Sequence, residues 1–179
     1  MKQIALLLNN RKMAIGFAVA MLLGVTLIFS QYFGAFPLSD EYALDMLMYY
    51  SKERFFDTLN LLDSVSRTSY LMIHLADYIF MFGFYQLIAL GLYKLTVTLD
   101  KLKPIVLIPY LAFLGDFLEN IIMDLHLLIY PSQINLLGYL AGVVTFVKFS
   151  SMYLALALLI VLTFYRLIQG MMKQRNSSR

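Results

Sequence analysis

Four long apolar stretches dominate the pattern along the chain. They are residues 13–30, 70–92, 104–130 and 136–168. Crossing the hydrocarbon core of a bilayer, which is ~30 Å thick, takes about 20 mostly apolar residues in a helix. The last two stretches are longer than this, which favours helices that tilt or project beyond the core. We therefore predict an all-α polytopic membrane protein, with residues 1–179 forming one domain around a four-transmembrane-helix bundle.

The connections between these stretches predict how the bundle is arranged. Residues 31–69 are acidic, and Ser39 to Glu41 has the pattern of a helix start followed by apolar side chains. We expect this region to be an outer amphipathic segment that lies on the membrane face or caps the bundle. Pro131 should end the third helix. Because the link to Leu136 is short, the third and fourth spans should form an antiparallel hairpin.

Basic residues are unevenly divided between the two ends of the predicted spans. Ten lysines and arginines lie near one set of ends: Lys2, Arg11, Lys12, Lys94, Lys101, Lys103, Arg166, Lys173, Arg175 and Arg179. Three lie in the opposite loops: Lys52, Arg54 and Arg67. Since cytoplasmic loops carry an excess of Lys and Arg, this predicts a multi-pass protein of the cell (inner) membrane with both termini cytoplasmic. The exit from the first span has no small-x-small cleavage site, so we expect an uncleaved signal anchor.

Composition supports the membrane prediction and excludes several chemistries. The chain is 61% hydrophobic and 14% charged, with a mean hydropathy of +0.75, whereas soluble domains carry about 25% charged residues. It has no cysteine, which excludes disulfides, thiolate metal sites and a cysteine nucleophile. The net charge of +3 is not gathered on a basic face with aromatics, so we expect no nucleic-acid partner. No pattern indicates a cofactor or a metal, and membrane lipids are the partners expected.

Polar and ionisable residues interrupt three of the predicted spans. They are Asp77 in the second span, Asp116, Glu119, Asn120 and Asp124 in the third, and Thr145 and Lys148 in the fourth. A charge at mid-membrane costs about 2.5–3.5 kcal/mol, so such residues usually pair or face a polar cavity. At ~1.5 Å per residue, Asp77, Glu119 and Lys148 lie about 10–12, 16 and 18 Å from the outer ends of their spans. We expect them to meet in one layer, in the outer half of the bilayer.

The spacing and charge of these residues suggest what such a site does. Asp116, Glu119 and Asn120 project from one helix face because they are three and four residues apart. Against the single cation Lys148, ionised Asp77, Asp116 and Glu119 would leave two excess negative charges. We expect either that one or two carboxyls stay protonated as proton donors, or that the site accepts a cation or a cationic head group. The alternative is a buried ion-pair network that only fixes helix packing.

Four further residues have possible roles near this cluster. Thr145 lies three residues before Lys148, which would suit a hydroxyl nucleophile beside a lysine base. Such a threonine more often bonds its own helix backbone, and we favour that interpretation. His74 and His126 lack a third ligand at metal spacing, so we expect interfacial hydrogen bonds rather than metal binding. Tyr85 follows Asp77 by two turns and is expected to place its hydroxyl in the cavity.

Several short motifs resemble those of a family of small bacterial four-helix membrane proteins of uncharacterised function. The motifs are Arg67-x-x-Tyr70, Asp77-x-x-Phe80 with Tyr85, Asp116-x-x-Glu119-Asn120 and Thr145-x-x-Lys148. The likeness runs from about residue 39 to the end of the fourth span, and its Asp-x-x-Glu-Asn element is the most specific part. The chain departs from the family pattern at Met81, where the family has proline, and at Phe149, where it has tryptophan. The resemblance implies the same architecture and polar cluster but no reaction.

In size and helix count alone, the chain is also similar to the sterol isomerase and sigma-2 receptor superfamily. Those proteins hold a sterol-like or cationic amphiphilic ligand among helices that bear acidic residues. This similarity implies a fold-level analogy only, because function depends on the site rather than on the fold.

Three hypotheses of function follow. In the first, the protein binds or modifies a lipid-like or amphiphilic small molecule through Asp77, Tyr85, Asn120 and Thr145. If it is an enzyme, Glu119 or Asp116 donates a proton, and Lys148 with Asn120 stabilises the resulting charge. In the second, the carboxylates form the relay of a proton- or cation-coupled transport subunit, although the sequence has no evident repeat. In the third, the chain is a structural or interaction subunit with no chemistry.

Overall fold

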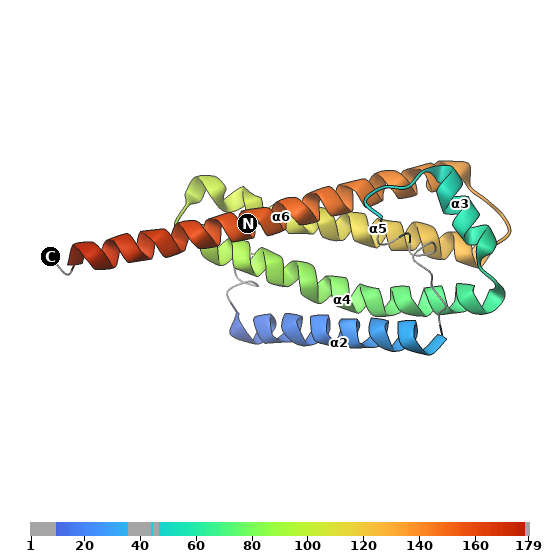
Figure 1. Cartoon of the computed structure of the whole chain (residues 1–179), viewed down its shortest axis with the longest axis horizontal. Coiled ribbons are helices and arrows are strands. Elements are labelled where there is room, and N and C mark those ends of the chain that lie inside the picture. Colours follow the sequence, from blue (N-terminus) through green and yellow to red (C-terminus); the bar gives the residue numbers. More distant parts are fainter. Residues whose placement is uncertain (1–9, 36–43, 45–46, 178–179) are drawn as a thin grey trace.

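The structure, a computed structural model, describes residues 10–35, 44 and 47–177, and Figure 1 shows this part of the chain as a bundle of helices. The elements are α2 (Arg11–Ala35), α3 (Lys52–Leu61), α4 (Ser64–Thr96), η2 (Asp100–Leu107), α5 (Ile108–Ile129) and α6 (Asn135–Ser177). No strand occurs among the described residues. The predicted all-α class is confirmed. The helix start expected at residues 39–41 lies outside the described residues.

Four helical stretches are long and apolar enough to cross a membrane, and they define a multi-pass membrane protein. They are Arg11–Ser30, Ser64–Thr96, Asp100–Ile129 and Asn135–Arg175. The second and fourth extend beyond the predicted limits at both ends, because polar residues in the flanking turns continue the helix. The third begins as the 3₁₀ helix η2, which contains Pro104. With 43 residues and a rise of ~1.5 Å per residue, α6 is about 65 Å long, and its C-terminal part projects beyond the bundle (Figure 1).

Helix α4 occupies the centre of the arrangement, with α2 on one side and α5 and α6 on the other (Figure 1). Glycines allow α2 and α4 to approach closely. A Cβ atom at Gly24 of α2 would lie 2.5 Å from the Phe80 Cα of α4, and one at Gly83 of α4 would lie 2.4 Å from the Phe17 carbonyl oxygen of α2. Small residues at such crossings let helix backbones approach, which is how helices commonly associate in membranes.

The short helix α3 lies across one end of the bundle, here called the α3 end (Figure 1). The Ser51 hydroxyl caps its N-terminus by accepting a hydrogen bond from the Arg54 amide at 3.2 Å. Phe55 and Phe56 are buried, and a Cβ atom at Gly138 of α6 would lie 2.7 Å from the Phe56 ring. The segment between the first two spans therefore packs directly on the start of α6. The predicted hairpin of the third and fourth spans is present as α5 and α6.

Candidate functional site

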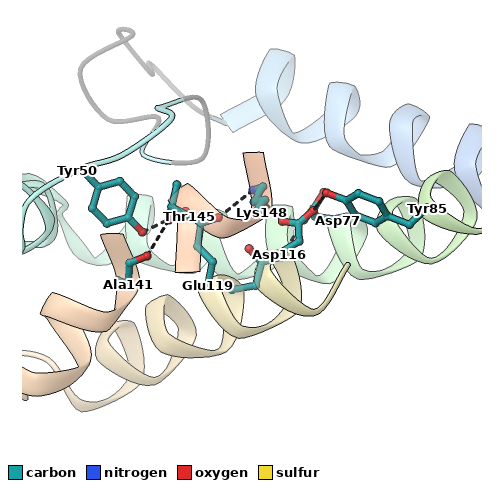
Figure 2. Close-up of polar contacts among 9 residues, drawn as sticks. Tyr50, Asp77, Tyr85, Asp116, Glu119, Ala141, Thr145 and Lys148 are labelled. Carbon is teal, nitrogen blue, oxygen red and sulfur yellow. Dashed lines mark hydrogen bonds and ion pairs between the residues drawn. The ribbon is translucent and has the colours of Figure 1, made fainter. Parts of the chain in front are cut away.

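A buried polar cluster joins α4, α5 and α6 with the residues that precede α3 (Figure 2). We define the Glu119 cluster as Tyr50, Tyr85, Asp116, Glu119, Thr145 and Lys148. At its centre, Glu119 is 1% exposed, and Asp116 beside it is 4% exposed. Both lie on the face of α5 that the sequence spacing predicts. Lys148 of α6, 7% exposed, completes the charged core of the cluster.

Glu119 accepts hydrogen bonds on both carboxylate oxygens. Lys148 Nζ donates to Oε2 at 2.9 Å, and the Thr145 hydroxyl lies 2.6 Å from Oε1. The Thr145 hydroxyl is also 2.8 Å from the Ala141 carbonyl oxygen one turn earlier, so it contacts both its own helix backbone and Glu119. The Tyr50 hydroxyl donates to Oε1 at 3.1 Å. Glu119 is thereby held by α6 on one side and by a non-helical residue on the other.

Asp116 shares the same ammonium group but is bound differently. The Tyr85 hydroxyl of α4 donates to Asp116 Oδ2 at 2.9 Å. Lys148 Nζ lies 2.7 Å from Oδ1 as an ion pair, and within the described part of the chain Oδ1 accepts no aligned hydrogen bond. Two buried carboxylates therefore surround one ammonium, and when ionised they leave one excess negative charge.

A glycine brings the two helices of this ion pair together. A Cβ atom at Gly115 of α5 would lie 3.0 Å from the Lys148 backbone nitrogen. This close approach lets the Lys148 side chain reach two carboxylates that are one turn apart on α5. Because the site is buried, the charges interact more strongly than they would in water. Removing these ions from water also costs free energy, and only ions that stay paired recover it.

The remaining polar residues of α4 and α5 make a second row of contacts. Asn120 Nδ2 donates to Asp77 Oδ2 at 2.8 Å, and Asp77 is only half-buried. Closer to the α3 end, His74 Nδ1 lies 2.5 Å from Asp124 Oδ1. The Tyr78 hydroxyl donates to the other oxygen of Asp124 at 2.9 Å. This row joins α4 to α5, beside the Glu119 cluster.

His126 holds the connection between α5 and α6. Its Nδ1 is 2.8 Å from the Ile122 carbonyl oxygen, and the Ile134 amide donates to its Nε2 at 3.3 Å. His126 therefore links the last turn of α5 to the residue that precedes α6. No three side chains of His, Asp or Glu converge as metal ligands among the residues that the structure describes.

A surface cleft of about 430 Å³ opens at the α3 end, separate from the Glu119 cluster. We call it the α3 cleft; it is lined by Tyr49, Ser51, Lys52, Glu53, Asn135, Leu136 and Tyr139. Tyr50 lies between two lining residues in the chain, yet its own hydroxyl reaches inward to Glu119. The backbone of Tyr50 rests on α6, since a Cβ atom at Gly142 would lie 2.0 Å from its carbonyl oxygen. Tyr50 thus separates the cluster from the cleft.

The structure brings together most of the residues singled out from the sequence and adds others. Glu119, Asp116, Lys148, Thr145 and Tyr85 share one cluster, whereas Asp77 and Asn120 form a pair beside it. Sequence reasoning missed Tyr50 and the lining of the α3 cleft. Tyr50 belongs to a run of methionines, leucines and tyrosines, which resembles ordinary apolar surface, so only the packing on Gly142 reveals its direction. Comparison with protein-family models, curated proteins and solved structures gave no match to this chain.

Proposed function

We propose that this protein binds the polar group of a lipid-like or amphiphilic small molecule at the Glu119 cluster. The observation that carries the proposal is the arrangement of two buried carboxylates around one ammonium, with Lys148 Nζ 2.7 Å from Asp116 Oδ1 and 2.9 Å from Glu119 Oε2. An excess negative charge in a low-dielectric site attracts a cation. A ligand ammonium would neutralise that charge and, in place of the Tyr50 hydroxyl, donate a hydrogen bond to Glu119 Oε1. The preferred ligand is therefore a cationic amphiphile.

The proposal includes a position in the membrane. Glu119 is ten residues from the end of α5, and Lys148 is thirteen from the start of α6, which is about 15 and 20 Å along the helices. With the excess of basic residues at the opposite end, the α3 end faces outward and both termini are cytoplasmic. The motif resemblance to small bacterial membrane proteins favours the cell (inner) membrane. In a hydrocarbon core that is ~30 Å thick, the ligand site then lies near the middle of the bilayer, deeper than the outer half expected from the sequence.

Tyr50 is the group that a ligand displaces on entry. Its contact with Glu119 Oε1, at 3.1 Å, is longer than the contacts of Thr145 and Lys148 with the same carboxylate, at 2.6 and 2.9 Å. It is also the one cluster residue that lies outside the spanning helices. A short movement of the segment before α3 would therefore expose Glu119 without separating any two spans. In a catalytic version of the proposal, Asp116 or Glu119 donates a proton to the bound molecule while Lys148 stabilises the resulting charge.

The test measures binding of a long-chain alkylammonium amphiphile to the protein in lipid nanodiscs, with an alcohol of the same chain length as the uncharged control. Glu119→Gln should weaken ammonium binding about 10- to 150-fold, because a hydrogen bond to a charged group contributes about 1.5–3 kcal/mol. Alcohol binding should change little. Asp124→Asn is the matched control, since it neutralises a carboxylate outside the cluster.

A second variant separates ligand binding from a purely structural role. Tyr50→Phe removes the hydroxyl that competes for Glu119 Oε1, so the variant should lose some thermal stability while binding the ammonium amphiphile more tightly. A packing network predicts loss of stability with no gain in binding. If the wild type and both variants all bind the ammonium amphiphile no more tightly than the alcohol, the cluster has only a packing role.

A second candidate function, a proton- or cation-coupled transport subunit, is favoured by the row of contacts along α4 and α5. The pairs His74 with Asp124 and Asn120 with Asp77 continue the polar path from the Glu119 cluster toward the α3 end. Such a path suits a relay of protons. Proton or cation flux into liposomes that contain only this protein, abolished by Asp116→Asn, would favour transport over amphiphile binding.

A further inference from the structure

The α3 cleft combines charges of both signs at the surface of the bundle. Lys52 Nζ lies 3.8 Å from Glu53 Oε1, and their side chains are 36% and 70% exposed. The pKa of Glu53 is below its usual value because its own backbone amide and the Ser51 hydroxyl donate hydrogen bonds to it. Glu53 is therefore an anion at neutral pH. An exposed ion pair at this separation is weak. Lys52 and Glu53 can therefore each give up this contact for a ligand group of opposite charge.

The size and position of the cleft suit the head group of a lipid. Its volume of about 430 Å³ falls in the range of about 300–1,000 Å³ typical of small-molecule sites. Tyr49 and Tyr139 line it with half-exposed rings. Tyrosines are enriched at membrane–water interfaces, where the ring faces the acyl boundary and the hydroxyl faces the head groups. The cleft thus has the chemistry of an interfacial site.

An apolar track continues from the cleft along α6. The α6 stripe, as we define it, consists of Leu136, Tyr139, Leu140, Val143 and Phe146. These residues follow helical spacing on one face, and each is between 38% and 67% exposed. Leu136 and Tyr139 belong both to the stripe and to the cleft. An acyl chain along the stripe would therefore begin at a polar site.

We propose that the α3 cleft binds the head group of a zwitterionic phospholipid, with Lys52 on the phosphate, Glu53 on the ammonium and an acyl chain along the α6 stripe. This site is distinct from the Glu119 cluster, and it requires only that the α3 end lie at a membrane surface. The bound lipid would rest against Tyr49 and Ser51, the chain neighbours of Tyr50. Lipid in the cleft therefore holds Tyr50 in its contact with Glu119.

The test is native mass spectrometry of the delipidated full chain with phosphatidylethanolamine, phosphatidylglycerol and diacylglycerol of identical acyl chains. Lys52→Gln should lower the affinity for both phospholipids about 10-fold, because both carry the phosphate and a charge-assisted hydrogen bond is lost. Glu53→Gln should lower phosphatidylethanolamine affinity by a similar factor and leave phosphatidylglycerol affinity unchanged or higher. Lys103→Gln is the matched control, because Lys103 is half-exposed and paired with Asp100 at the opposite end of the bundle.

The ratio of the two phospholipid affinities decides the proposal. A preference for phosphatidylethanolamine that falls about 10-fold in Glu53→Gln, but not in Lys103→Gln, would support it. An unchanged ratio in Glu53→Gln would overturn it, as would diacylglycerol binding as tightly as either phospholipid. Thermal unfolding of each variant is measured alongside, because both cleft substitutions lie in the first turn of α3. A Glu53→Gln variant that unfolds at the wild-type temperature and keeps the wild-type ratio overturns the proposal. A Lys52→Gln variant that unfolds at the wild-type temperature and keeps the wild-type affinity for both phospholipids overturns it as well.

Discussion

Removing the ammonium of Lys148 should be the most destabilising single change in the Glu119 cluster. Lys148 Nζ lies 2.7 Å from Asp116 Oδ1 and 2.9 Å from Glu119 Oε2. Lys148→Met keeps most of the side-chain volume but leaves two buried carboxylates that repel each other. Breaking a buried ion pair by removing one partner costs about 3–5 kcal/mol. This is a large share of a folding free energy of about 5–15 kcal/mol.

The assay is reversible unfolding of the purified protein in mixed micelles, followed by circular dichroism. Neutralising the carboxylates as well, in the triple variant Lys148→Met, Asp116→Asn and Glu119→Gln, should recover at least half of the loss. The surface control Lys103→Met should cost under about 1 kcal/mol, as exposed ion pairs do. The reasoning is refuted if Lys148→Met unfolds within about 1 kcal/mol of wild type. It is also refuted if the triple variant is no more stable than the single one, since the loss would then come from packing.

Two further predictions test the Tyr50 segment and the pH dependence of helix capping. Gly142→Ala should displace the backbone of Tyr50, because the new Cβ would lie 2.0 Å from the Tyr50 carbonyl oxygen. Amide hydrogen exchange of residues 47–51 should therefore become faster. The control Gly16→Ala, whose new Cβ would have nothing within 4 Å, should leave that exchange unchanged. Asp63 caps α4 by accepting the Ser66 amide hydrogen bond at 2.7 Å, which lowers its pKa below the ordinary 3.8. The contribution of this hydrogen bond to the free energy of unfolding is fully present above pH 3.8. It is lost as the pH falls through the lower pKa that Asp63 has in the folded state. The free energy of unfolding of Asp63→Asn should lack this pH dependence. Identical dependence of unfolding on pH in the variant and the wild type would contradict the capping role of Asp63.

Much of the fold could be predicted because the features that define it are local. The length of an apolar run fixes whether a helix can cross a bilayer, so the four spans could be predicted from the positions and lengths of the apolar stretches. The α-helical period equally placed Asp116, Glu119 and Asn120 on one face. The N-terminal limit of α4 was missed by six residues because the Asp63 cap and the polar turn after it continue the helix outside the apolar run.

The pairing of the polar residues was decided by the tertiary structure. Depth along the helices predicted a common layer for Asp77, Glu119 and Lys148, but it could not say which carboxylates Lys148 would contact. That choice depends on the rotation of α6 against α5, which the close approach at Gly115 fixes. In the structure Lys148 pairs with Asp116 and Glu119, and Asp77 accepts a hydrogen bond from Asn120. No pattern within a single segment of the sequence specifies how α6 is rotated against α5.

The sequence by itself determined the class of protein, the number of spans and the presence of charged residues within them, since each of these follows from hydrophobicity and helical period along a single segment. Only the tertiary structure decided that Tyr50 closes the cluster and that the α3 cleft exists. Both depend on the packing of α3 onto Gly138 of α6 and of the residues before α3 onto Gly142. Contacts of this kind join residues about 90 positions apart in the chain. They arise from the complementary shapes of two surfaces, which neither segment specifies alone.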